Sequence, residues 1–196
     1  MRTGRLEAFS DGVLAILITI MVLEFKIPHE TTLAALRPLV PVAVSYLLSF
    51  IYLGIYWNNH HHLLYATERL NGTILWANLH LLFWLSLVPF VTAWMGENHF
   101  APVPTAAYGA ILLLAAVAYT ILQWLIVTSQ PDDSVLRRAV RSDLKGKLSP
   151  FIYMAAIPLA LVRPWIAGVL YAVVALVWLA PDRRIERVLR EDGEPM

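Results

Sequence analysis

Hydrophobic residues along this chain gather into six runs, separated by stretches that contain proline, glycine or charged residues. None of the runs alternates polar and apolar positions as a half-buried strand does, and their lengths are typical of helices. The pattern predicts an all-α polytopic membrane protein with six transmembrane helices, which form a single domain over residues 1–196. The predicted spans are residues 9–25, 42–60, 73–95, 103–128, 149–162 and 165–180.

Two prolines fall at the predicted starts of the last two helices, Pro150 and Pro164. Proline suits the first turn of a helix because that turn has no intrahelical hydrogen bond to lose. The link from Val162 to Trp165 is so short that it predicts a tight reversal between these helices.

Composition supports a membrane protein and excludes several other classes. Hydrophobic residues make up 59% of the chain, and the mean hydropathy is +0.63, above that of ordinary soluble domains. Fifteen basic and fourteen acidic residues almost cancel, which argues against a nucleic-acid partner. Because the chain has no cysteine, disulfides, thiolate metal sites and cysteine catalysis are excluded.

Basic residues predict the orientation in the membrane, because they concentrate in cytoplasmic segments. With a cytoplasmic N-terminus, only Lys26, Arg37 and Arg163 of the fifteen basic residues lie outside. The other twelve lie inside: Arg2, Arg5, Arg69, Arg137, Arg138, Arg141, Lys145, Lys147, Arg183, Arg184, Arg187 and Arg190. We therefore predict a multi-pass protein of the cell membrane with both termini in the cytoplasm and the linker 130–147 on the same side.

The first hydrophobic run is too short for an ordinary membrane span. Only twelve uncharged residues separate Asp11 from Glu24, and they extend over about 18 Å of helix. A hydrocarbon core is about 30 Å thick, so both acids would lie close to lipid. Such a helix is better placed within a bundle or beside a water-filled path.

One face of this helix combines a small residue, branched apolar residues and one hydroxyl. At 100° per residue, Gly12, Ile16, Thr19, Ile20 and Leu23 point in similar directions. This stripe could line a narrow pore or form a packing seam, and the pattern alone favours packing.

Asp11 lies about 140° around the helix from Ile16 and so points away from the stripe. An ion pair with Arg5, within or between subunits, is the simplest structural role for Asp11.

Two further groups of polar residues are candidate sites. Asn78 and His80 lie within an apolar span, where polar groups usually face protein or water, so each could form an interhelical hydrogen bond or contact a transported species. His60, His61 and His62 are consecutive, and adjacent helical positions point about 100° apart, so they cannot share one metal ion. We expect these histidines at a polar helix end in a cytoplasmic loop, with no metal site and no cofactor.

The N-terminal helix resembles the opening helix of the transmembrane protein 175 family of potassium channels. The similarity rests on a short motif with flanking positions: Arg5, Phe9, Ser10, Asp11, Gly12, Val13, Ala15, Ile16 and Thr19. The chain length and the six predicted spans are also similar to prokaryotic members with a single repeat. The resemblance implies a homotetramer in which the first helix of each subunit lines a pore that conducts potassium, without a Thr-Val-Gly-Tyr-Gly filter.

Residue roles follow from the same resemblance. It implies that Ile16 forms the pore constriction, that Ile20 and Leu23 form further apolar rings, and that Thr19 influences selectivity. It further implies that four residues hold the pore helix against its neighbours: Arg5, Phe9, Ser10 and Asp11.

Other functions stay open on the residues alone. A small secondary transporter would need a midplane site and usually an internal repeat, and no convincing repeat joins the two halves. A proton-permeable channel is a further alternative. An intramembrane enzyme could offer only His80 with distant partners, so we expect no enzymatic activity.

Overall fold

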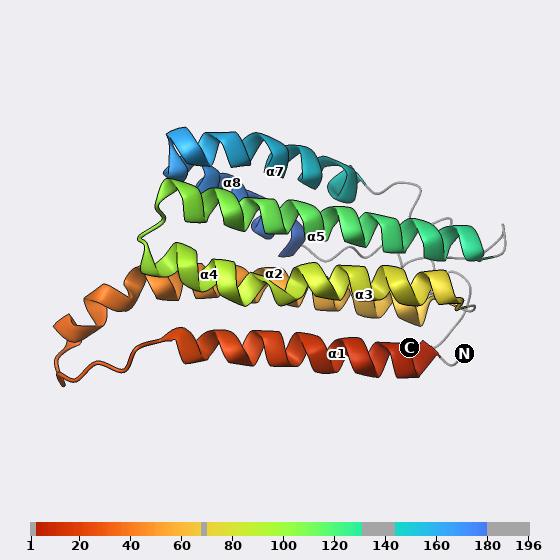
Figure 1. The fold of residues 1–196 in the computed structure, drawn as a ribbon, viewed down its shortest axis with the longest axis horizontal. Helices are drawn as coiled ribbons and strands as arrows, with labels where there is room; N and C mark the ends of the chain where they lie inside the picture. Colours follow the sequence, from red (N-terminus) through yellow and green to blue (C-terminus); the bar gives the residue numbers. More distant parts are fainter. Residues whose placement is uncertain (1–2, 68–69, 131–143, 180–196) are drawn as a thin grey trace.

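The computed structural model describes residues 3–67, 70–130 and 144–179, and every regular element in these ranges is a helix (Figure 1). Helices that follow one another in the chain run in alternate directions along the long axis of the bundle, except that Val88–Glu97 continues the direction of Gly72–Ser86. The all-α prediction is therefore confirmed for the described residues. The elements are α1 (Thr3–Ile20), the 3-10 turns η1 (Met21–Glu24) and η2 (Leu33–Leu39), α2 (Val40–Tyr65), α3 (Gly72–Ser86), α4 (Val88–Glu97), α5 (Pro102–Ser129), α7 (Leu144–Val162) and α8 (Pro164–Leu179).

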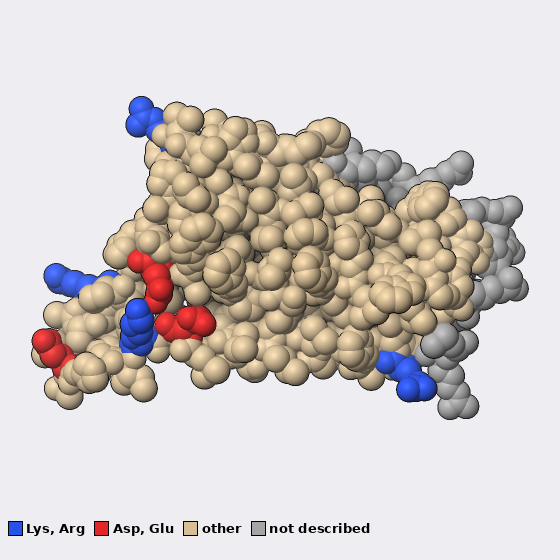
Figure 2. All heavy atoms as spheres, in the orientation of Figure 1, with Lys and Arg blue, Asp and Glu red and all other residues tan. Residues whose placement is uncertain are grey.

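Four segments of the described chain are long and apolar enough to cross a membrane: Thr3–Glu24, Leu33–Tyr65, Gly72–Glu97 and Pro102–Ser129. The apolar parts of α7 and α8 are shorter. The space-filling view shows charged side chains at the two ends of the bundle and a wide uncharged belt between them (Figure 2). This distribution is that of a multi-pass membrane protein.

The third span is divided, because α3 ends at Ser86 and α4 begins at Val88. Pro89 lies in the first turn of α4, where its missing N–H does not remove a helical hydrogen bond. The sequence predicted one continuous span over residues 73–95, which includes Pro89. The proline instead starts a second helix that continues the same rod (Figure 1).

Of the two predicted helix starts, one is confirmed and one is wrong. α8 begins at Pro164, directly after a reversal that leaves only Arg163 between α7 and α8. α7, however, begins at Leu144, so that Pro150 lies inside the helix. A proline within a membrane helix is tolerated where neighbouring groups satisfy the freed carbonyl.

Two hydrophobic clusters form the core. One joins α1, α2, α3 and α5 through leucines that include Leu14, Leu53 and Leu81. The other joins α2, α4, α5, α7 and α8 and is rich in tyrosine and alanine. At its centre, Gly109 allows the ring of Tyr171 to lie against α5, because a Cβ at position 109 would overlap the tyrosine hydroxyl.

At the end of the bundle where α1 finishes, an ion pair connects the η1–η2 loop to the end of α4. Lys26 Nζ lies 2.8 Å from Glu97 Oε1, on the protein surface. The hydrogen bond that Lys26 donates to Glu97 in this ion pair raises the pKa of Lys26.

Most basic residues that predicted the orientation lie outside the described residues: Arg2, Arg69, Arg137, Arg138, Arg141, Arg183, Arg184, Arg187 and Arg190. The same is true of positions 131–143 of the predicted cytoplasmic linker. The orientation therefore stays a prediction from charge.

Candidate functional site

The helix α1 has one buried face, and that face holds it in the bundle. Ser10, Leu14, Leu17 and Met21 are buried, at intervals of three and four residues. This spacing places all four on one side of the helix, toward the first core cluster. Leu6, Val13 and Ile18 are partly buried and pack against the same cluster.

The predicted stripe lies on the exposed part of α1. Ile16, Ile20 and Leu23 expose 62%, 44% and 76% of their surface. Gly12 and Thr19 are also exposed. Within one chain, therefore, the stripe is not a packing seam, and four of its five members present carbon atoms to whatever lies beside α1.

Thr19 is the hydroxyl of the stripe, and its proton is shared within its own helix. Its Oγ1 lies 3.0 Å from the carbonyl oxygens of both Ala15 and Ile16. A hydroxyl donates one hydrogen and has two lone pairs, so the oxygen can still accept a hydrogen bond or approach a cation.

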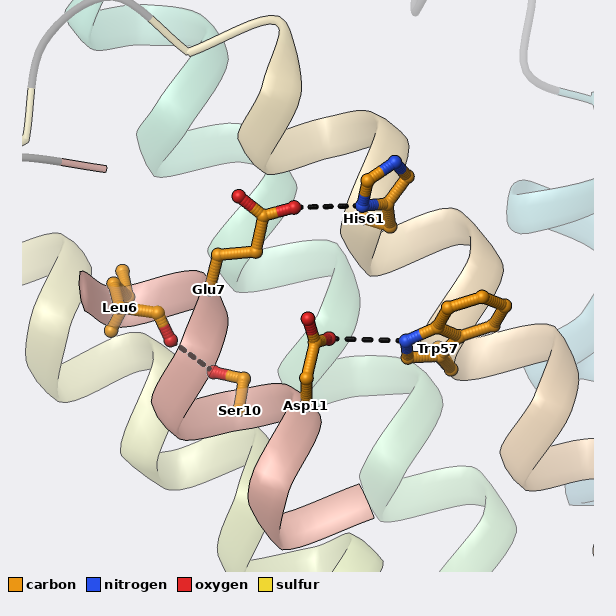
Figure 3. Close-up of polar contacts among 6 residues, drawn as sticks. All are labelled: Leu6, Glu7, Ser10, Asp11, Trp57 and His61. Carbon is orange, nitrogen blue, oxygen red and sulfur yellow. Dashed lines mark hydrogen bonds and ion pairs between the residues drawn. The ribbon is translucent and has the colours of Figure 1, made fainter. Parts of the chain in front are cut away.

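A buried polar cluster connects α1 to α2 and α3. Asn78 Nδ2 donates to Ser10 Oγ at 3.0 Å, and Ser10 Oγ donates to the carbonyl of Leu6 at 2.9 Å (the latter drawn in Figure 3). Asn78 Oδ1 lies 2.6 Å from His60 Nε2. Because the amide oxygen can only accept, His60 carries its proton on Nε2. The other ring nitrogen of His60, Nδ1, is buried without a hydrogen-bond partner.

Two acids on α1 contact two residues on α2. Glu7 Oε1 lies 2.7 Å from His61 Nδ1, and Trp57 Nε1 donates to Asp11 Oδ1 at 3.1 Å. Figure 3 shows both acids extending from the same side of α1 toward α2. The two acids are four residues apart on α1, and their two partners are four residues apart on α2. Adjacent turns of one helix therefore meet adjacent turns of the other. The contacts fix the rotation of α1 about its axis.

The expected ion pair between Arg5 and Asp11 is not formed within the chain. The ion pairs of the described residues are Lys26–Glu97 and Glu7–His61. Asp11 instead accepts from an indole, and Arg5 is exposed.

Phe9 is also exposed, at 52%. Of the four motif residues that the resemblance implied as anchors, Ser10 and Asp11 therefore make anchoring contacts inside one chain. Arg5 and Phe9 face away from it.

The two polar residues of the third span differ in their surroundings. Asn78 is fully buried and makes the interhelical hydrogen bonds described above, one of the two roles that the sequence allowed. His80 is exposed and accepts a hydrogen bond from Trp84 Nε1 at 2.9 Å, within α3. The hydrogen bond and the ring contact of His80 therefore lie within α3 and do not join it to another helix.

The three consecutive histidines lie inside α2 and not in a loop, because this helix continues to Tyr65. His60 is buried against α3, while His61 faces α1. The described residues contain no group of three potential metal ligands. The sequence analysis missed the pairing of Glu7 with His61 and of Asp11 with Trp57. The equal spacing of four residues in each pair was the available signal.

These features define a multi-pass helical membrane protein whose first helix is fixed by polar contacts on one side and uncovered on another. The family described as "Endosomal/lysosomal potassium channel TMEM175" matches residues 5–89, a range that contains all of these contacts.

Similar proteins extend the match to the whole chain. A potassium channel from Chryseobacterium sp. (strain P1-3) is 53% identical over 98% of this chain and 100% of the relative. A potassium channel from Chamaesiphon minutus is 32% identical over 84% of this chain and 87% of the relative. The crystal structure of a lysosomal potassium-selective channel TMEM175 homolog from Chamaesiphon minutus has a TM-score of 0.81 and 30% identity, covering 92% of this chain and 97% of that one.

The chain belongs to the TMEM175 family. The resemblance stated from the N-terminal motif is thereby confirmed, and so is the fold class. The named relatives are channels and not enzymes.

Proposed function

We propose that this protein is the subunit of a potassium-permeable cation channel, in which four copies surround a central pore lined by α1. The names of its relatives support potassium as the permeant ion. The whole chain, residues 1–196, would form one channel domain in the cell membrane, with both termini in the cytoplasm. The channel would need no cofactor beyond the permeant ion.

The exposed stripe of α1 is the observation that carries this proposal. Contacts with α2 and α3 fix α1 in one rotation, so the stripe points away from its own subunit. Lipid is a poor environment for the stripe, because Glu24 follows it by one residue and Asp11 precedes it by one. A central axis shared with other subunits gives the stripe an apolar contact and the acids access to water.

Within this arrangement, Ile16 forms the narrowest ring, and Ile20 and Leu23 form further apolar rings. Branched side chains that meet on an axis exclude water and act as a hydrophobic gate. Thr19 places one hydroxyl per subunit between these rings, where an ion has lost part of its hydration. In the proposed channel, Thr19 influences the selectivity between cations and Ile16 closes the pore.

Single-channel recording of the purified protein in planar bilayers tests the function. Unitary currents carried by potassium support a channel, because a transporter cannot move ions at that rate. The absence of unitary currents in correctly assembled protein would contradict the proposal. A reversal potential that follows the pH gradient, with potassium replaced by a large organic cation, would identify the proton-permeable alternative.

The subunit number is tested separately. The mass of the assembled protein should equal four subunits, and Ile16→Cys should form disulfide-linked dimers under mild oxidation, because four equivalent side chains meet on the axis. A protein that stays monomeric in lipid would contradict the pore.

A further inference from the structure

A small, partly open cavity lies away from α1, and the proposed pore does not account for it. It has a volume of about 50 Å³ and is lined by residues of α2, α5, α7 and α8. At about 10–15 Å³ for each water-sized sphere, it has room for about four water molecules, or for a ligand of similar size.

Five aromatic residues are part of the cavity wall: Tyr52, Tyr56, Tyr119, Tyr153 and Trp178. The polar atoms at the α7–α8 side satisfy one another, because Trp178 Nε1 donates to Ser149 Oγ at 2.8 Å, and Ser149 Oγ donates to the carbonyl of Lys145 at 2.9 Å. This side of the cavity offers a ligand mainly apolar surface.

Two other polar side chains of the lining have unused hydrogen-bonding capacity. Tyr56 on α2 and Gln123 on α5 line the cavity, and neither side chain makes a hydrogen bond in the described part of the chain. Both side chains are partly exposed. A tyrosine hydroxyl and a glutamine amide can each donate and accept.

We propose that this cavity is a binding site for a small neutral amphiphile of about four to six non-hydrogen atoms, for which a short alcohol is the simplest representative. Its polar end would bond to Tyr56 and Gln123, and its carbon end would lie against the rings. The ligand is neutral because none of the lining side chains is acidic or basic, so a charge would be buried without a partner. Water alone would leave the aromatic surface without an apolar contact. The inference does not rest on the proposed pore.

The test is a titration of the purified protein in lipid nanodiscs with millimolar trifluoroethanol, followed by fluorine NMR, with empty nanodiscs to measure partitioning into lipid. A saturable component beyond partitioning is expected. Tyr56→Phe and Gln123→Leu each remove polar atoms while keeping the side-chain size, and each should weaken binding about fivefold, the factor for one net hydrogen bond. Tyr46→Phe removes a hydroxyl from the same helix outside the cavity and should leave the affinity unchanged.

Ala116→Leu adds three carbon atoms to the cavity wall and should abolish the saturable component. Two results would overturn the proposal: a wild-type signal no larger than that of empty nanodiscs, or equal binding by wild type, Tyr56→Phe and Gln123→Leu. In the first case the cavity holds only water. In the second the alcohol binds elsewhere.

Discussion

The sharpest prediction compares asparagine at two adjacent positions of α1. Ile16 is 62% exposed in the subunit, whereas Leu17 is 8% exposed and belongs to the core cluster. Ile16→Asn therefore removes almost no packing within the subunit, and its effect on subunit stability should stay within about 0.5 kcal/mol, as for other surface substitutions. If four Ile16 side chains close the pore, the amides let water occupy the constriction and conductance at rest rises.

Leu17→Asn is the matched control, with the same chemical change one position along the helix. Loss of a buried leucine costs about 2–5 kcal/mol, and an amide buried without a partner costs about 1–3 kcal/mol more. The sum is comparable with the whole stability of many domains, about 5–15 kcal/mol. Leu17→Asn should therefore give little assembled protein and no leak.

The measurement is potassium flux into liposomes, divided by the amount of assembled protein. Ile16→Asn should exceed both wild type and Leu17→Asn in this flux, and each tenfold increase corresponds to a fall of about 1.4 kcal/mol in the barrier. Equal flux per assembled channel from all three proteins would refute the constriction at Ile16. Equal loss of assembly from both variants would show that the stripe is a packing surface.

Further predictions concern selectivity, anchoring, packing and orientation. Thr19→Val keeps the side-chain shape and removes the oxygen, so the potassium-to-sodium permeability ratio from biionic reversal potentials should fall. An unchanged ratio would show that the Thr19 hydroxyl does not contribute to selectivity. Asp11→Asn weakens the contact with the Trp57 indole on α2 by about 1 kcal/mol, so assembly or open probability should change while ion preference does not. A shifted reversal potential would contradict the placement of Asp11 away from the stripe. Gly96→Ala places a Cβ 2.9 Å from a backbone carbon of α2, and this overpacking should cost about 1–3 kcal/mol, visible as a lower melting temperature. Ser134→Cys and Asn98→Cys should be labelled from opposite sides of the membrane; position 134 lies outside the described residues. Labelling of Ser134→Cys by an impermeant reagent added outside intact cells would show that the predicted orientation is wrong.

The sequence by itself determined the class of the protein. Hydropathy is a sum over neighbouring residues, so the positions of the apolar runs and the all-α fold could be read without any knowledge of packing. The direction of each side chain on α1 also followed from the sequence, because helical geometry is fixed at 100° per residue. Pro164 marked a helix start correctly for the same local reason. Pro150 did not mark a helix start, because neighbouring groups decide whether a membrane helix can continue through a proline.

Tertiary structure alone decided which face of α1 is covered. An apolar stripe looks the same in sequence whether it packs against a neighbour or stays open, and α1 is apolar on most sides. The contacts that settle the question join residues far apart in the chain: Ser10 with Asn78, Glu7 with His61, and Asp11 with Trp57. Such pairings depend on how α1, α2 and α3 pack, so no local pattern contains them. They rotate α1 so that Ser10 is buried and Ile16 is exposed, and that rotation is the physical basis for placing the stripe on a pore.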